Sequence, residues 1–249
     1  MNINQALFIA LEAGEILLRN GAETYRVEES IIKICNGLGF SCETIVFPTG
    51  IFLTISSDEK DSETSVRRIK VRTFNLLKID RVNSFSRKVL NNPISYDEAL
   101  KELEEIKALK TYSIPLQLIS ASIVTFAFAT LFGGSIKDSF AALIIGLFAY
   151  ILNLMMQKAG YFPFLINFVL SFICGMLSLL MSTLITDSNV YIIIISSVLM
   201  YLPGVAMTNG IRDLLVGDIV SGLTRLGEAL LTIIAIGLGV GLALSVGIK

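Results

Sequence analysis

The chain has 249 residues, is 53% hydrophobic and carries a net charge of −1, and its mean hydropathy is +0.72. A near-neutral chain without a stripe of Lys and Arg is not typical of a nucleic-acid-binding protein. Histidine is absent, which removes the commonest general base and the commonest zinc ligand. The three cysteines fit no metal-binding spacing. We therefore expect neither a metal site nor a cofactor.

The first 110 residues predict a small α+β domain that begins with two helices. Apolar residues recur at helical spacing over residues 3–18, and Asn20 with Gly21 is typical of a helix end. Thr24 can cap a second helix, which ends near residue 37. The pattern then changes to short β-branched and aromatic runs. These runs predict strands over 44–47, 51–56 and 65–73.

Two further helices close this domain. Asp80 is expected to cap a helix that runs to about Leu90. Ser95 and Glu98 form a capping box that opens a helix with one apolar face. Two acidic residues interrupt the first apolar stretch of the chain, which therefore does not resemble a secretory signal. We expect the α+β domain, residues 1–110, to lie in the cytoplasm.

Charged residues are scarce after this domain. Residues 1–113 carry 31 of the 41 charged side chains, and the remaining 136 residues carry only ten. The charge-free runs are each close to the ~20 residues that cross a bilayer as a helix. The sequence therefore predicts an all-α membrane domain over 111–249, in a multi-pass protein of the cell membrane. Its five transmembrane helices are expected near 114–132, 139–157, 162–185, 190–208 and 229–247.

The flanking positive charges predict the orientation of these helices. With the N-terminus inside, five lysine and arginine residues flank the helices on the cytoplasmic side, and only Lys137 and Lys249 flank them outside. Short cytoplasmic flanks of membrane proteins carry an excess of positive charge. We therefore expect the N-terminus in the cytoplasm and the C-terminus outside.

The segment 209–228 is too polar to span a membrane and too apolar for an ordinary loop. On a helix, its residues Asp218, Arg225 and Glu228 share one face. Pro203 and Gly204 precede the segment and are expected to break the helix before it. Two interpretations stay open. The segment is either an amphipathic helix at the membrane surface whose charges pair with their sequence neighbours, or a charged face that lines a solute pathway.

Two stretches of the chain resemble a known family. The first is Gly21-Ala22-Glu23-Thr24-Tyr25-Arg26-Val27-Glu28, followed by Pro48-Thr49-Gly50. The second is Thr208-Asn209-Gly210-Ile211-Arg212-Asp213-Leu214, followed by Gly217-Asp218, Ser221-Gly222, Arg225 and Glu228. Together they resemble the N-terminal module of the threonine/serine exporter family, over essentially the whole chain. The resemblance implies a secondary transporter, not an enzyme, that exports threonine and serine or a dicarboxylate such as succinate.

The resemblance also implies a partner. Fused members of the family carry further membrane helices after the equivalent of residue 249, so the chain resembles the larger subunit of the two-polypeptide systems. We expect a small membrane-protein partner that supplies the second half of the exporter, with a homo-oligomer as the alternative. Charges of the segment 209–228 left in contact with lipid would cost about 2–3 kcal/mol each at mid-depth. A partner subunit, or a second copy of this chain, is therefore expected to cover them.

On this interpretation, carboxylated solutes are bound by guanidinium groups, which form paired hydrogen bonds with carboxylates. The only two arginines after residue 113 lie in the segment 209–228. The candidate substrate-binding residues are Arg212, Arg225, Asn209 and Asn153. The candidate ion-coupling or charge-balancing residues are Asp213, Asp218 and Glu228, since a carboxylate in a partly dry site can exchange a proton near neutral pH.

Two alternatives stay open. The chain could be an assembly or regulatory subunit that has no transport path of its own. The N-terminal domain could instead be a hydrolase, because paired carboxylates can perform acid–base chemistry without histidine. The residues considered for this second site, whose role the sequence leaves unassigned, are Glu23, Arg26, Glu28 and Thr49. The sequence shows no nucleophile elbow, metal-ligand set or phosphate loop beside them, which favours transport.

Overall fold

The computed structural model describes residues 1–57, 61–92, 94–110 and 112–247. They form helices and one small antiparallel sheet, and they divide into two compact units. The first unit comprises Met1–Thr111 together with Thr208–Leu226, and the second comprises Tyr112–Met207 together with Gly227–Lys249. Chain order alone assigned the segment 209–228 to the membrane domain, whereas its contacts group most of it with the N-terminal residues.

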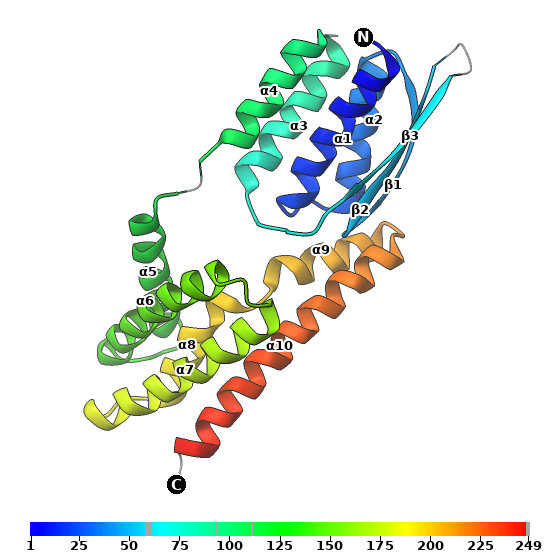
Figure 1. Ribbon diagram of the computed structural model, residues 1–249. Helices are drawn as coiled ribbons and strands as arrows, with labels where there is room; N and C mark the ends of the chain where they lie inside the picture. Colours follow the sequence, from blue (N-terminus) through cyan, green and yellow to red (C-terminus); the bar gives the residue numbers. More distant parts are fainter. Residues whose placement is uncertain (58–60, 93, 111, 248–249) are drawn as a thin grey trace. The chain divides into compact units, whose positions relative to one another are not determined.

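The first unit has the predicted order of two helices, three strands and two helices (Figure 1). Its elements are α1 (Ile3–Arg19), α2 (Thr24–Gly37), β1 (Ser41–Phe47), β2 (Gly50–Ser56), β3 (Ser62–Arg68), α3 (Leu76–Asn91) and α4 (Tyr96–Ala108). The strands pair in the order β1-β2-β3, all antiparallel. Alternation along β2 turns Ile51, Leu53 and Ile55 into the core, where α1 and α2 cover this face of the sheet.

Local side-chain caps explain most of these helix starts. Ser95 and Glu98 form the predicted capping box at the start of α4. The expected cap at Asp80 is wrong, because α3 begins at Leu76 and Asp80 lies inside it. The cap is Asn75, whose Oδ1 accepts a hydrogen bond from Lys78 N at 3.1 Å. This bond satisfies one of the backbone N–H groups that the first turn of a helix leaves without a partner.

The third strand is shorter than predicted, since β3 ends at Arg68 and not near residue 73. The residues after it leave the sheet and run past the end of α1. There Thr73 N donates to Arg19 O at 2.7 Å, and Asn75 N donates to Asn20 O at 3.1 Å. These backbone hydrogen bonds hold the end of α1, and with it the start of the loop Gly21–Thr24, against the rest of the first unit.

The second unit consists of apolar helices. Its elements are α5 (Ile114–Leu131), α6 (Ile136–Lys158), α7 (Pro163–Leu184), α8 (Val190–Val198) and the short helix η1 (Leu199–Tyr201), with parts of α9 (Gly204–Leu215) and α10 (Ile219–Gly247). In the described part of the chain, four helices are long and apolar enough to span a membrane: α5, α6, α7 and α10. A fifth span is present if α8–η1 and α9, which meet at a bend of 55°, count as one.

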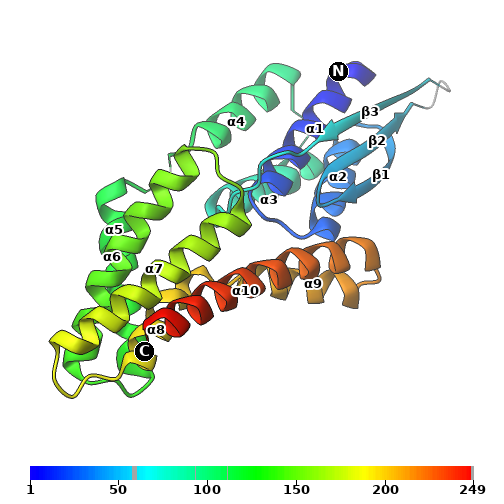
Figure 2. The ribbon, with the colours of Figure 1, turned by 60° about the horizontal axis from the view of Figure 1, so that its bottom comes forward.

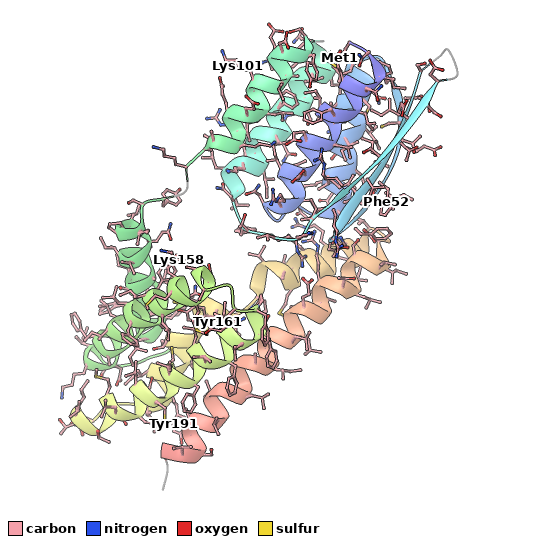
Figure 3. The ribbon with its side chains drawn as sticks, viewed as in Figure 1. Met1, Phe52, Lys101, Lys158, Tyr161 and Tyr191 are labelled. Atoms are coloured by element: carbon pink, nitrogen blue, oxygen red, sulfur yellow. The ribbon has the colours of Figure 1, made fainter. Side chains whose placement is uncertain are left out.

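The arrangement of α6, α7 and α8 gives the second unit two distinct ends. The three helices pack on one another, and α6 and α7 run alongside each other in Figure 2. Figure 3 labels Lys158 and Tyr161 at one end of these helices and Tyr191 at the other. Tyrosine and lysine are typical of the two boundaries of a membrane-spanning segment. A small residue also lets α10 approach α7 closely: a Cβ added to Gly239 of α10 would lie 2.5 Å from Phe168 O of α7.

The predicted division of residues 190–247 is wrong in detail. The predicted helix break at Pro203 and Gly204 is confirmed, since η1 ends at Tyr201 and α9 begins at Gly204. We also expected a separate polar segment over 209–228 and a new helix from 229. Instead, a turn containing Gly217 at φ 93° separates α9 from α10, and α10 is one continuous helix of 29 residues. At 1.5 Å per residue α10 is roughly 44 Å long, which exceeds the ~30 Å hydrocarbon layer.

Candidate functional site

The segment Thr208–Leu226 folds as a helical hairpin, which we call the polar hairpin. Its two helices approach each other at two glycines: a Cβ added to Gly222 would lie 2.8 Å from Gly210 O. Asp218 follows the turn and caps α10, because its Oδ1 accepts a hydrogen bond from Ser221 N at 3.1 Å. The absence of side chains at the crossing therefore lets the polar groups of both helices lie close together.

The polar hairpin binds four consecutive residues of the N-terminal sequence, Gly21–Thr24, which we call the motif loop. Three hydrogen bonds and one ion pair make the contact. They are Asn209 Nδ2 to Gly21 O at 3.0 Å, Arg225 Nη2 to Ala22 O at 2.8 Å, Thr24 Oγ1 to Asp218 Oδ2 at 2.8 Å, and the ion pair between Arg212 and Glu23. The two stretches that carry the family resemblance are thus bonded to each other, residue by residue.

A buried ion pair fixes the centre of this contact. Arg225 Nε lies 3.0 Å from Asp213 Oδ2, and the two residues are 6% and 0% exposed. The same guanidinium reaches Ala22 O, so Arg225 joins both helices of the polar hairpin to the motif loop. Pairing between sequence neighbours therefore does not account for this residue, because its partners include Asp213 on the other helix and Ala22 in the motif loop.

The second arginine is in a different environment. The Arg212 side chain is 46% exposed, and it contacts the carboxylate of Glu23, whose side chain is 9% exposed. The other carboxylate oxygen of Glu23 lies 3.4 Å from Arg26 Nε. Glu23 is therefore shared between two guanidinium groups, one from the polar hairpin and one from α2.

Part of the cover for the charged segment comes from this chain itself, although Arg212 and Glu228 stay exposed. We expected a partner subunit or a second copy to cover the charges of residues 209–228. Instead, the motif loop contacts Arg212, Arg225 and Asp218 directly. Sheltering these charges is therefore not by itself an argument for a partner.

Glu28 lies close to the same contact. Its Oε1 accepts a hydrogen bond from Val46 N at 3.0 Å. Burial raises the pKa of Glu28 above the ordinary carboxyl range, and the nearby charge of Asp218 adds to this, while the hydrogen bond from Val46 opposes it. Glu28 is thus a group in the first unit that is biased toward holding a proton.

Replacing Glu28 with glutamine should raise the melting midpoint of the purified chain at neutral pH. A raised pKa means that the folded state binds more protons than the unfolded state, so ionised Glu28 costs stability as the pH rises above the ordinary glutamate pKa of ~4.3. Glutamine keeps an oxygen for Val46 N and removes the charge. Thermal unfolding from about pH 4 upward should show a difference from the wild type that grows with pH and levels off above the folded-state pKa. A difference that shrinks with pH, or that grows nowhere in this range, would contradict the raised pKa.

Three other predicted residues lie outside both the motif loop and the polar hairpin. Asn153 lies on α6 in the second unit, where its Oδ1 accepts a hydrogen bond from Gln157 at 3.0 Å. Glu228 is exposed on α10, three residues after Arg225. Thr49 is exposed in the β1–β2 turn, where its carbonyl accepts from Ile69 N at 2.9 Å. Among the described residues, no group of three His, Cys, Asp or Glu side chains could hold a metal ion.

Comparison with known proteins identifies the family of this chain. The sequence model of the family described as "Putative threonine/serine exporter" matches residues 8–247. The chain belongs to this family. Over 240 residues it is 26% identical to the "Probable succinate transporter subunit YjjP" of Klebsiella aerogenes, an alignment that covers 95% of this chain and 92% of that protein. No solved structure matches the chain.

Membership of this exporter family, together with the four or five candidate spans, makes the chain a multi-pass membrane transport protein. At this coarse level the function is transport and not catalysis. Sequence reasoning found the residues on both sides of the contact between the motif loop and the polar hairpin but missed the contact itself. The available signal was that both stretches combine acidic and basic residues that are unusual for a membrane protein.

Proposed function

We propose that this chain is a subunit of a secondary transporter that exports small carboxylated metabolites, either threonine and serine or a dicarboxylate such as succinate. The family and the named relative support a transporter subunit. The observation that carries the substrate class is the half-exposed guanidinium of Arg212, which already holds a carboxylate, that of Glu23. Guanidinium groups bind carboxylates through paired, charge-assisted hydrogen bonds.

The contacts of the polar hairpin favour different roles for its residues. Arg212 is the proposed substrate anchor, because nearly half of its side chain is accessible. Arg225 was also predicted as an anchor, but its burial and its contacts with Asp213 and Ala22 favour a positioning role. Asp213 then balances Arg225, and Asp218 holds Thr24. Ion coupling by these carboxylates or by Glu228 stays a proposal.

The topology that we propose has five crossings, with the first unit in the cytoplasm. Residues 208–226 contact residues 21–24, so the stretch between the two parts of the first unit must cross the membrane an even number of times. This stretch contains three long candidate spans, α5, α6 and α7. A fourth crossing by α8 and the first turn of α9 meets the requirement, and α10 is the fifth.

Cysteines introduced at Ser57 and Val246 should label from opposite sides of the membrane. Ser57 follows β2 in the first unit, and Val246 is exposed near the end of α10. Five crossings place these positions on different sides, whereas four crossings, with α8 and α9 as a re-entrant loop, place them on the same side. Labelling of intact cells with an impermeant maleimide, before and after permeabilisation, distinguishes the two. Labelling of both positions from one side would contradict the proposed topology.

Export assays in cells test the proposed function. The relative is named as a subunit, and we propose that this chain also works with a second, small membrane protein. Cells that produce the chain alone should export little succinate, threonine or serine. Cells that also produce the small membrane protein encoded beside it should export at least one of them. Saturable export by the purified chain alone in liposomes would indicate a self-sufficient homo-oligomer, and absence of export with the partner would favour an assembly subunit.

A further inference from the structure

Glu23 belongs to a motif whose role the sequence leaves unassigned. Its position beside Arg212, the proposed substrate anchor, suggests a role for it. We propose that Glu23 is an internal carboxylate that occupies Arg212 when no substrate is bound and is displaced by the carboxylate of the substrate. The proposal rests on the function proposed above. It adds a specificity-determining residue in the N-terminal domain and a physical link between that domain and transport.

Chemical identity is the first argument. The group that contacts Arg212 is a carboxylate, which is the group shared by threonine, serine and succinate. The contact uses Nη1 of Arg212 and Oε1 of Glu23. A substrate carboxylate that forms paired hydrogen bonds through Nη1 would therefore compete with Glu23 for that donor.

The second argument is the contrast between the two ion pairs of the polar hairpin. Arg225 and Asp213 are both buried, so separating them would leave two buried charges without a partner and without water. The pair of Arg212 with Glu23 has one half-exposed partner. Water can reach Arg212 when this pair separates, and the buried Glu23 keeps a second guanidinium, that of Arg26, within 3.4 Å. Arg212 can therefore exchange its carboxylate while Arg225 keeps the hairpin in place.

The third argument is that a second guanidinium is ready to take the displaced side chain. Arg26 Nε lies 3.4 Å from the Glu23 oxygen that faces away from Arg212. Glu23 can therefore leave Arg212 without losing all of its ionic contacts. The neighbouring bonds of Ala22 and Thr24 hold the loop on either side, so the displacement is confined to one side chain.

The test measures ligand binding by thermal shift of the purified full chain with its partner, with succinate, threonine and serine as probes. Glu23→Gln removes the competing charge, so the concentration of the effective probe at half-maximal shift should fall about fivefold, the equivalent of one exposed ion pair of ~1 kcal/mol. Glu23→Asp keeps a carboxylate and should remain closer to the wild type. Glu29→Gln is the matched control, because Glu29 pairs with Lys33 on the same helix, at 2.6 Å.

The outcomes separate the inference from the proposed function. If Glu23→Gln folds, as judged by gel filtration, and binds the probe no more tightly than the wild type, Glu23 is not a competitor and the inference is overturned. Equal tightening by Glu29→Gln would also overturn it, since the effect would then be general electrostatics. If the wild type shows no shift with any of the three probes, the proposed substrate class fails.

Discussion

Replacing Arg225 with alanine should destabilise the folded chain strongly and abolish export. The change leaves the carboxylate of Asp213 buried without its cation, and breaking a buried ion pair in this way typically costs about 3–5 kcal/mol. It also removes the hydrogen bond to Ala22 O. One of the two interpretations left open by the sequence placed Arg225 at the membrane surface, where its loss would cost little stability. Its 6% exposure reverses that expectation. The melting midpoint and the rate of export are the two measurements.

Two further variants separate the charge from the geometry. Arg225→Lys should recover part of the stability but little export, because a point charge cannot reach Asp213 and Ala22 O together as the fork does. The double variant Arg225→Met with Asp213→Leu removes both charges and should restore much of the stability, since apolar residues often replace a buried pair at little cost. A midpoint for Arg225→Ala indistinguishable from that of the wild type would contradict the buried pair.

Replacing Arg212 with alanine should leave the chain folded but reduce export to background. The Arg212 side chain is 46% exposed, and its buried partner Glu23 keeps Arg26 as a second cation, so the melting midpoint should change less than in Arg225→Ala. Loss of the guanidinium removes the proposed anchor for the substrate carboxylate. Arg212→Lys should rescue poorly, because lysine cannot form the paired hydrogen bonds. Export of labelled succinate, threonine and serine from cells with the partner is the measurement.

The matched control for this variant is Arg87→Ala. Arg87 is also an exposed arginine of the first unit, and its side chain donates to Ser84 on its own helix at 3.1 Å. It should export at the wild-type rate. Export by Arg212→Ala at that same rate would remove Arg212 from the substrate path and favour a purely structural polar hairpin.

Local signals in the sequence predicted local structure well. The capping box at Ser95 predicted the start of α4, and the long charge-free runs predicted the candidate spans α5, α6 and α7. Both depend on residues that are near one another in the chain. The end of α9 was missed because a single glycine, Gly217 at positive φ, makes the turn inside a stretch that otherwise keeps helical spacing. The start of α3 was missed because Asn75 and Asp80 are both good caps, and sequence does not rank them.

Partners that are distant in sequence could not be predicted in this way. The rule that charges pair at helical spacing considers only Glu228 for Arg225, and it omits the contacts of Arg225 with Asp213 and Ala22. Arg212 and Glu23 are 189 positions apart. No periodicity connects residues so far apart, and only packing of the hairpin against the end of α1 and the start of α2 brings them together. The resemblance identified both stretches, and the structure adds that they form one site.

The most direct test of this contact is cross-linking of Thr24 to Asp218 in native membranes. Their side chains are hydrogen-bonded at 2.8 Å, so cysteines at the two positions should join through a short bifunctional thiol reagent. The background is a variant with Cys35, Cys42 and Cys174 replaced by alanine. Lys101 with Asp218 is the control pair, since Lys101 lies on α4, away from the hairpin within the same unit (Figure 3). The account predicts rapid cross-linking of the first pair and not of the second. Absence of cross-linking in the first pair, or equal cross-linking in both, would contradict it.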